Sequence, residues 1–160
     1  MGSGYGIKCL ACEYKESFLE WIGALYDSCL FGLGKKSWIF DIVRGYNFFS
    51  TQQKRRLSHE INKALNMPDA KPYVYDGWSN YYCHACSRLY NLFEFSITHE
   101  NGKYIPDYNC ATCQSSLIKV EVQARSDHVN VLDGNLQIEY KCPKCKSSMA
   151  EDEQAFLLWD

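Results

Sequence analysis

The sequence predicts an α+β fold in which two small β modules are each closed by four cysteines and the first module contains a helical insertion. Eight of the nine cysteines fall into four Cys-x-x-Cys pairs. Apolar residues alternate along segments that adjoin these pairs, which is typical of strands. An amphipathic segment with the helix period lies between the first two pairs. We expect the first module at residues 1–95, with the insertion at about 27–68, and the second module at 96–160.

The four cysteine pairs point to metal binding. They are Cys9/Cys12, Cys83/Cys86, Cys110/Cys113 and Cys142/Cys145. Two cysteines separated by two residues in a tight turn direct both sulfurs at one point, about 2.3 Å from a metal ion. The opening residues have no pattern of a secretory leader, so we expect a reducing compartment and favour metal ligation over disulfides. Eight thiolates complete two tetrahedral sites, which predicts two structural Zn²⁺ ions and two zinc ribbons of the rubredoxin-like type.

The common spacing permits more than one way of combining the pairs. We expect sequential pairing, because it keeps each metal within its own module. Site 1 would then consist of Cys9, Cys12, Cys83 and Cys86, and site 2 of Cys110, Cys113, Cys142 and Cys145. The alternative is a nested arrangement, in which the outer pairs share one metal and the inner pairs share the other.

Iron is the alternative metal. Rubredoxin-type iron sites use the same two turns, usually with glycine directly after the second cysteine. The corresponding positions here are Glu13, Ser87, Gln114 and Lys146. Zinc is therefore favoured, and rubredoxin-like electron transfer is a lesser alternative.

Hairpins are expected to carry the cysteine turns. Residues 117–122 alternate after the third pair, a long loop follows near residues 126–130, and after a turn at Asp133-Gly134 residues 136–140 return to the fourth pair. A second hairpin is expected from residues 92–97 and 103–105. The C-terminal segment 151–160 is expected to fold back as a strand or cover, with a docking peptide as the alternative.

Two helices are expected in the insertion. The clearer one, from about residue 51 to residue 66, opens with the capping box Ser50-x-x-Gln53 and ends before Pro68. Its apolar stripe is formed by Leu57, Ile61, Ala64 and Leu65. A shorter helix is expected over residues 38–44.

Two groups of residues are candidates for contact with a partner. The face of the longer helix opposite its apolar stripe carries Arg55, Arg56, His59 and Lys63. Aromatic residues gather before the second cysteine pair, with Tyr73, Tyr75 and Trp78 as the candidates. The formal charge of −2 excludes a broad basic field for polyanions. A solvated helix face and a ring-filled core are the alternatives for these groups.

Catalysis and membrane insertion are disfavoured. Four thiolates per metal leave no open coordination position, and no hydrolase or deaminase motif surrounds the four histidines. His84 lies within a cysteine turn and is expected to be a surface ring. Cys29 could act as a nucleophile, but a small buried residue is the better interpretation. Apolar runs fall well short of the roughly 20 residues of a membrane span.

Three segments carry a family resemblance. They are Gly4-Tyr-Gly-Ile-Lys-Cys-Leu-Ala-Cys-Glu-Tyr14, Tyr82-Cys-His-Ala-Cys-Ser-Arg-Leu-Tyr-Asn91, and Tyr140-Lys-Cys-Pro-Lys-Cys145 with Leu157-Leu-Trp-Asp160. Together they resemble a family of small, uncharacterised bacterial tandem zinc-ribbon proteins. The resemblance implies the tandem architecture and a cytoplasmic setting in a bacterium or phage, and it implies no activity.

From these observations we expect a non-catalytic, zinc-stabilised binding or adaptor module that recognises a protein partner. Nucleic-acid binding through the basic helix and the aromatic strand is the alternative. Rubredoxin-like electron transfer and a Cys29-dependent enzyme come third.

Overall fold

The computed structural model of the 160-residue chain describes residues 2–20, 38–155 and 157–159. It is β-rich, and the α+β expectation is confirmed. The strands are β1 (Gly2–Cys9), β2 (Lys15–Glu20), β3 (Lys71–Cys83), β4 (Arg88–His99), β5 (Gly102–Tyr104), β6 (Ile118–Ala124), β7 (Val129–Asp133), β8 (Leu136–Glu139), β9 (Met149–Glu151) and β10 (Leu157–Trp159). The helices are α2 (Trp38–Gly45) and α3 (Thr51–Leu65).

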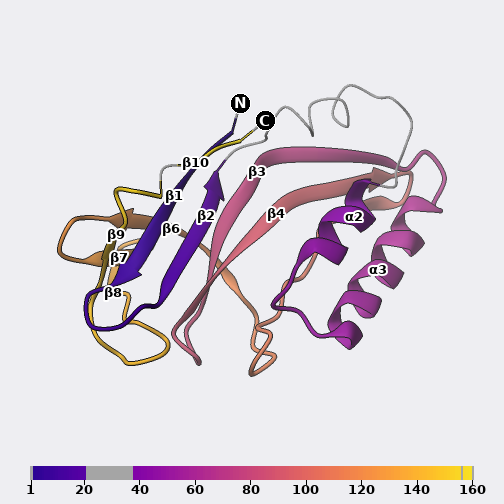
Figure 1. Ribbon diagram of the computed structural model, residues 1–160. Helices are drawn as coiled ribbons and strands as arrows, with labels where there is room; N and C mark the ends of the chain where they lie inside the picture. The colour runs from indigo at the N-terminus through magenta and orange to yellow at the C-terminus, as the bar shows by residue number, and fades with distance from the viewer. Residues whose placement is uncertain (1, 21–37, 156, 160) are drawn as a thin grey trace.

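The strands form two antiparallel sheets. A four-stranded sheet has the order β10-β1-β2, with β9 also paired to β1, and a six-stranded sheet has the order β5-β4-β3-β6-β7-β8. Figure 1 shows the long β3–β4 hairpin crossing the middle of the molecule, with α2 and α3 on one side and β1 and β2 on the other.

The helices begin where the sequence predicts. The Ser50 side chain accepts a hydrogen bond from the Gln53 amide, and the Gln53 side chain accepts one from the Ser50 amide, so the capping box is confirmed. The predicted apolar stripe of α3 is buried. Both helices lie within residues 27–68, and residues 27–37 of that range lie outside the described residues.

The chain after the third cysteine pair forms a meander rather than the expected hairpin with a long loop. Residues 129–133, part of which was expected to be loop, form the additional strand β7 between β6 and β8. Val129 and Val131 are fully buried. Two short turns replace the long loop, because the apolar side chains of β7 gain burial in the core.

The C-terminal segment folds back onto the first strand, as expected. β9 and β10 both pair antiparallel with β1. The Asp152 amide donates to the Gly6 carbonyl, and a Cβ at Gly6 would overlap the Cβ of Ala155. Glycine at this position therefore allows the returning chain to approach β1 closely.

Two cores share the β3–β4 hairpin. Near the start of β4, Leu89 belongs to one core and the next residue, Tyr90, belongs to the other. The core under the helices is built around Ile39, Val43, Ile61, Phe93 and Phe95. The second core is built around Ile7, Phe18, Val131, Tyr140 and Met149. The boundary expected between residues 95 and 96 falls inside β4, which runs without interruption to His99.

The side-chain amide of Asn91 joins the two sheets. Its Oδ1 accepts from the Leu19 amide at 2.9 Å, and its Nδ2 donates to the Leu19 carbonyl at 3.0 Å. Asn91 on β4 thereby bonds to the edge of β2 as a neighbouring strand would.

Candidate metal centres

The eight paired cysteines gather into two tetrads. In each tetrad the four sulfurs all lie within 4.8 Å of one another. The terminal tetrad is Cys9, Cys12, Cys142 and Cys145, and the internal tetrad is Cys83, Cys86, Cys110 and Cys113. The expected sequential pairing is therefore wrong, and the structure has the nested arrangement.

Strand pairing explains this correction. Lys8, directly before the first pair, lies opposite Ala150, and Tyr82, directly before the second pair, lies opposite Ile118. Both partners follow the first cysteine of the later pair by eight residues. The strand after the fourth pair thus lies beside the strand before the first, and the same register joins the third pair to the second. Because backbone ladders set this register, the tetrads follow from sheet topology rather than from proximity along the chain.

The sulfur distances fit a four-thiolate site. Cys9 and Cys145 lie 3.4 Å apart, Cys12 and Cys142 3.8 Å, and Cys12 and Cys145 3.6 Å. In the internal tetrad Cys83 and Cys113 lie 3.5 Å apart. Four sulfurs placed tetrahedrally about 2.3 Å from one ion would be about 3.8 Å from one another. None of these eight cysteines forms a disulfide.

The turns have the backbone of metal-binding knuckles without the usual glycines. Ser87, Gln114 and Lys146, each directly after a second cysteine, have φ of 50°, 64° and 65°. A side chain in this left-handed region costs about 1–2 kcal/mol. Inside two of the turns a backbone amide donates to the sulfur of the first cysteine: Ala11 N–H to Cys9 Sγ at 3.3 Å, and Thr112 N–H to Cys110 Sγ at 3.4 Å.

Local hydrogen bonds favour thiolate at the exposed corner of each tetrad. Interactions with the Ser115 hydroxyl and amide lower the pKa of Cys113 to about 6, and those of Ser147 lower the pKa of Cys145 to about 6. The neighbouring thiol Cys113, together with burial, raises the pKa of Cys86 to about 12.

The internal tetrad has an additional donor. The Tyr90 hydroxyl lies 3.2 Å from Cys110 Sγ. Burial raises the pKa of Cys110, but this hydroxyl and two backbone amides outweigh it and lower the pKa. A buried thiolate with this many donors is suited to ligation.

The sequence contains a signal against the sequential pairing that spacing alone misses. The first two pairs read Cys-x-Ala-Cys, whereas the last two lie in the longer repeat Tyr-x-Cys-x-x-Cys-x-Ser-Ser, at residues 108–116 and 140–148. Each tetrad combines one turn of each type. The two ribbons therefore have the same internal order, and one is inserted in the other.

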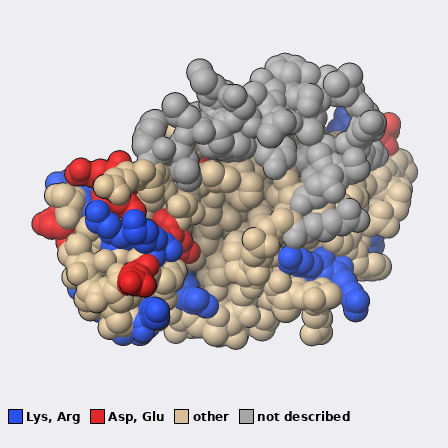
Figure 2. Space-filling model, in the orientation of Figure 1, with Lys and Arg blue, Asp and Glu red and all other residues tan. Residues whose placement is uncertain are grey.

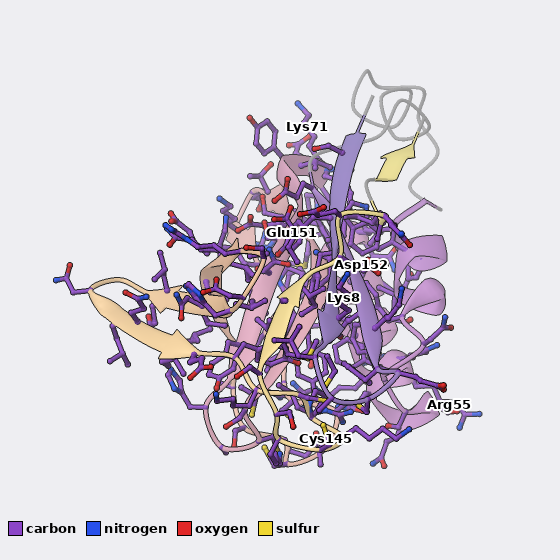
Figure 3. The ribbon with its side chains drawn as sticks, turned by 60° about the vertical axis from the view of Figure 1, so that its left-hand side comes forward. Lys8, Arg55, Lys71, Cys145, Glu151 and Asp152 are labelled. Atoms are coloured by element: carbon purple, nitrogen blue, oxygen red, sulfur yellow. The ribbon has the colours of Figure 1, made fainter. Side chains whose placement is uncertain are left out.

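The predicted partner-binding residues do not form one surface. On α3, Arg55, His59 and Lys63 are exposed, but Arg56 forms an ion pair with Glu60 at 3.3 Å. Figure 3 shows Arg55 projecting from the outer side of α3, far from Lys8 and Asp152, which lie close together beside β1.

The aromatic candidates on β3 are also divided. Tyr73 is 58% exposed, whereas Trp78 packs edge-on against Phe93 in the core. The side chain of Tyr75 and all of Cys29 lie outside the described residues. His84 is exposed, lies 3.3 Å from Asp133 and belongs to neither tetrad.

A groove between the two ribbons is the feature that sequence reasoning missed. It encloses about 410 Å³ and is lined by residues of β2, β4, the α2–α3 connection and the third cysteine turn. Tyr14 and Tyr140 both donate to Oε2 of Glu16 in its lining, at 2.9 and 3.4 Å. In Figure 2 charged side chains gather toward the ends of the visible face, and its centre is almost uncharged.

No described helix is long and apolar enough to cross a membrane. The two four-cysteine clusters that the family resemblance implies are confirmed. Membership of a bacterial family stays a prediction. Comparisons with protein-family models, curated proteins and solved structures return no match.

Proposed function

We propose that the protein is a non-catalytic adaptor, stabilised by two zinc ions, that recognises a protein partner through the groove between its ribbons. Zinc is supported by the donor set, because four thiolates in tetrahedral spacing suit Zn²⁺ and leave no site for a metal-bound water. Free thiols at all eight positions suit a reducing compartment such as the cytoplasm.

The groove is the observation that carries the proposal. Its lining joins elements of both ribbons, so a partner bound there would contact surfaces that only the folded, metal-bound chain brings together. Five aromatic side chains line it, and aromatic residues are enriched where proteins bind proteins. They are Tyr14, Phe18, Phe48, Tyr90 and Tyr140.

Nucleic-acid binding remains the alternative proposal. It is supported by the exposed Arg55, His59 and Lys63 on α3. The Arg56–Glu60 ion pair and the packed ring of Trp78 reduce the number of groups available to phosphates and bases.

Affinity capture with the metal-loaded full chain tests both proposals. We expect retained proteins to survive nuclease treatment and to be lost with Phe48→Ala, which opens the aromatic wall. The control is Arg55→Ala together with Lys63→Ala on α3. Metal analysis should give two zinc ions per chain for every variant. Loss of the partner on nuclease treatment, or with the α3 variant alone, would favour nucleic acid instead.

A further inference from the structure

The groove contains the half-buried carboxylate of Glu16, whose hydrogen bonds come from two neutral hydroxyls. Burial raises the pKa of Glu16, and the hydroxyls of Tyr14 and Tyr140, together with the more distant charge of Arg88, only partly offset this. Among the described residues, no Lys or Arg forms an ion pair with it. A carboxylate held in a cavity by neutral donors is suited to a cation brought in by a ligand.

The aromatic side chains that line the groove also favour a positively charged ligand. Tyr90 and Phe48 pack edge-on with ring centroids 5.2 Å apart, and both line the cavity with Glu16. Aromatic faces attract ammonium and guanidinium groups, most strongly where water is excluded. The one cation among the lining residues, Arg88, is exposed and donates to the Thr112 hydroxyl at 3.2 Å.

The edge of β2 beside the groove can bind an extended chain. β2 ends the strand order of its sheet. The Leu19 amide and carbonyl face outward and are bonded by Asn91, so the main chains of Ser17 and Lys15 face the same way, because strand groups alternate. No described strand pairs with them. A residue added opposite Glu16 would have its side chain on the same face as the carboxylate.

Overall charge is consistent with a cationic ligand. The formal charge of −2 becomes about −6 when eight thiolates hold two dications. Long-range attraction would therefore speed the approach of a basic segment.

We propose that the groove binds an extended segment of the partner, which adds to the free edge of β2 and places a lysine or arginine side chain over Glu16. This inference rests on the proposed function and specifies the chemistry of the partner. Main-chain bonds to β2 align the segment, and the carboxylate and aromatic rings select its side chain.

A random decapeptide display library, selected on the metal-loaded full chain, tests the inference. We expect enriched peptides to contain a Lys or Arg among β-forming residues. Glu16→Gln retains an acceptor for the Tyr14 hydroxyl but removes the charge, and should weaken these peptides at least about tenfold. N-methylation of the peptide amide that faces Ser17 should weaken binding as well.

Two matched variants make the result decisive. Arg88→Gln should leave affinity unchanged or raise it, and Arg55→Gln on α3 should leave it unchanged. Acidic peptides that depend on Arg88, enriched peptides without a cation, or no enrichment at all would each overturn the inference. If captured partners still require Phe48 while peptides show no cation preference, this inference fails and the adaptor function stands; if neither holds, both fail.

Discussion

The two tetrads have the same local geometry but close very different lengths of chain. In the internal tetrad Cys83 meets Cys113 across 30 residues, whereas in the terminal tetrad Cys9 meets Cys145 across 136. Loop-closure entropy makes the longer closure about 1.3 kcal/mol more costly. The internal tetrad is also joined to the core that the helices cover. We therefore expect the internal ribbon to fold first and the terminal ribbon to fold onto it.

The largest expected effect is that of Cys110→Ser. Cys110 is fully buried in the core under the helices, and a four-thiolate zinc contributes on the order of 10 kcal/mol to folding in small modules. We expect loss of the internal metal and cooperative unfolding of the whole chain, measured as near-UV circular dichroism and metal content. A variant that keeps its thermal transition would contradict the expectation that the whole fold depends on the internal ribbon.

Cys142→Ser is expected to do less. It removes the terminal metal, which Cys9 shares, while the internal ribbon keeps its own. Hydrogen exchange should show β1, β2 and β9 losing protection while β3 and β4 retain it. One metal ion per chain should remain. If both cysteine variants lose protection and metal to the same extent, the two ribbons do not differ in their importance for folding.

Gly6→Ala tests the terminal ribbon without touching a ligand. The added methyl would overlap Ala155, and overpacking of this kind costs about 1–3 kcal/mol. We expect a lower denaturant midpoint with both metals retained. The double variant with Ala155→Gly should recover stability, and a failure to recover would mean that the contact with Ala155 is not the cause.

The smallest effect is expected from the serine hydroxyl that lies beside one cysteine of each tetrad. Ser115→Ala and Ser147→Ala each remove a hydroxyl that lowers a cysteine pKa. The lowered pKa favours the folded thiolate above the ordinary thiol pKa, and this stabilisation is lost as the pH falls through about 6. Without the hydroxyl, protons compete with the metal at higher pH. The midpoint of acid-induced metal release should move upward by the same amount in both variants, measured with a chromogenic chelator. A shift in only one variant would show that the tetrads differ electrostatically.

Local signals predicted local structure well. The capping box placed the start of α3, and Cys-x-x-Cys spacing identified all eight tetrad cysteines. Pairing was mispredicted because four turns of one spacing look alike until the residues around them are compared. The Ser-Ser that follows only Cys113 and Cys145 is the feature that separates them.

The groove could not be predicted in the same way. Glu16, Phe48, Arg88 and Thr112 belong to four separate segments. Long-range contacts bring these segments together: the Leu19 main chain bonds to the Asn91 side chain, Phe48 packs against Tyr90, and Arg88 donates to the Thr112 hydroxyl. Strand β7 was missed for a related reason: its first two residues were assigned to a loop, and the burial of Val129 and Val131 depends on contacts with the second core.

The nested order also has a consequence for biosynthesis. Cys12 leaves the ribosome 130 residues ahead of Cys142, its partner in the terminal tetrad. At about 5–20 residues per second, the first two thiols wait roughly 7–26 s for the other half of their site. During that interval the internal ribbon can load its metal and fold, while Cys9 and Cys12 remain open to other metals and to oxidants. Co-translational metal supply should therefore protect the start of this chain more than its middle.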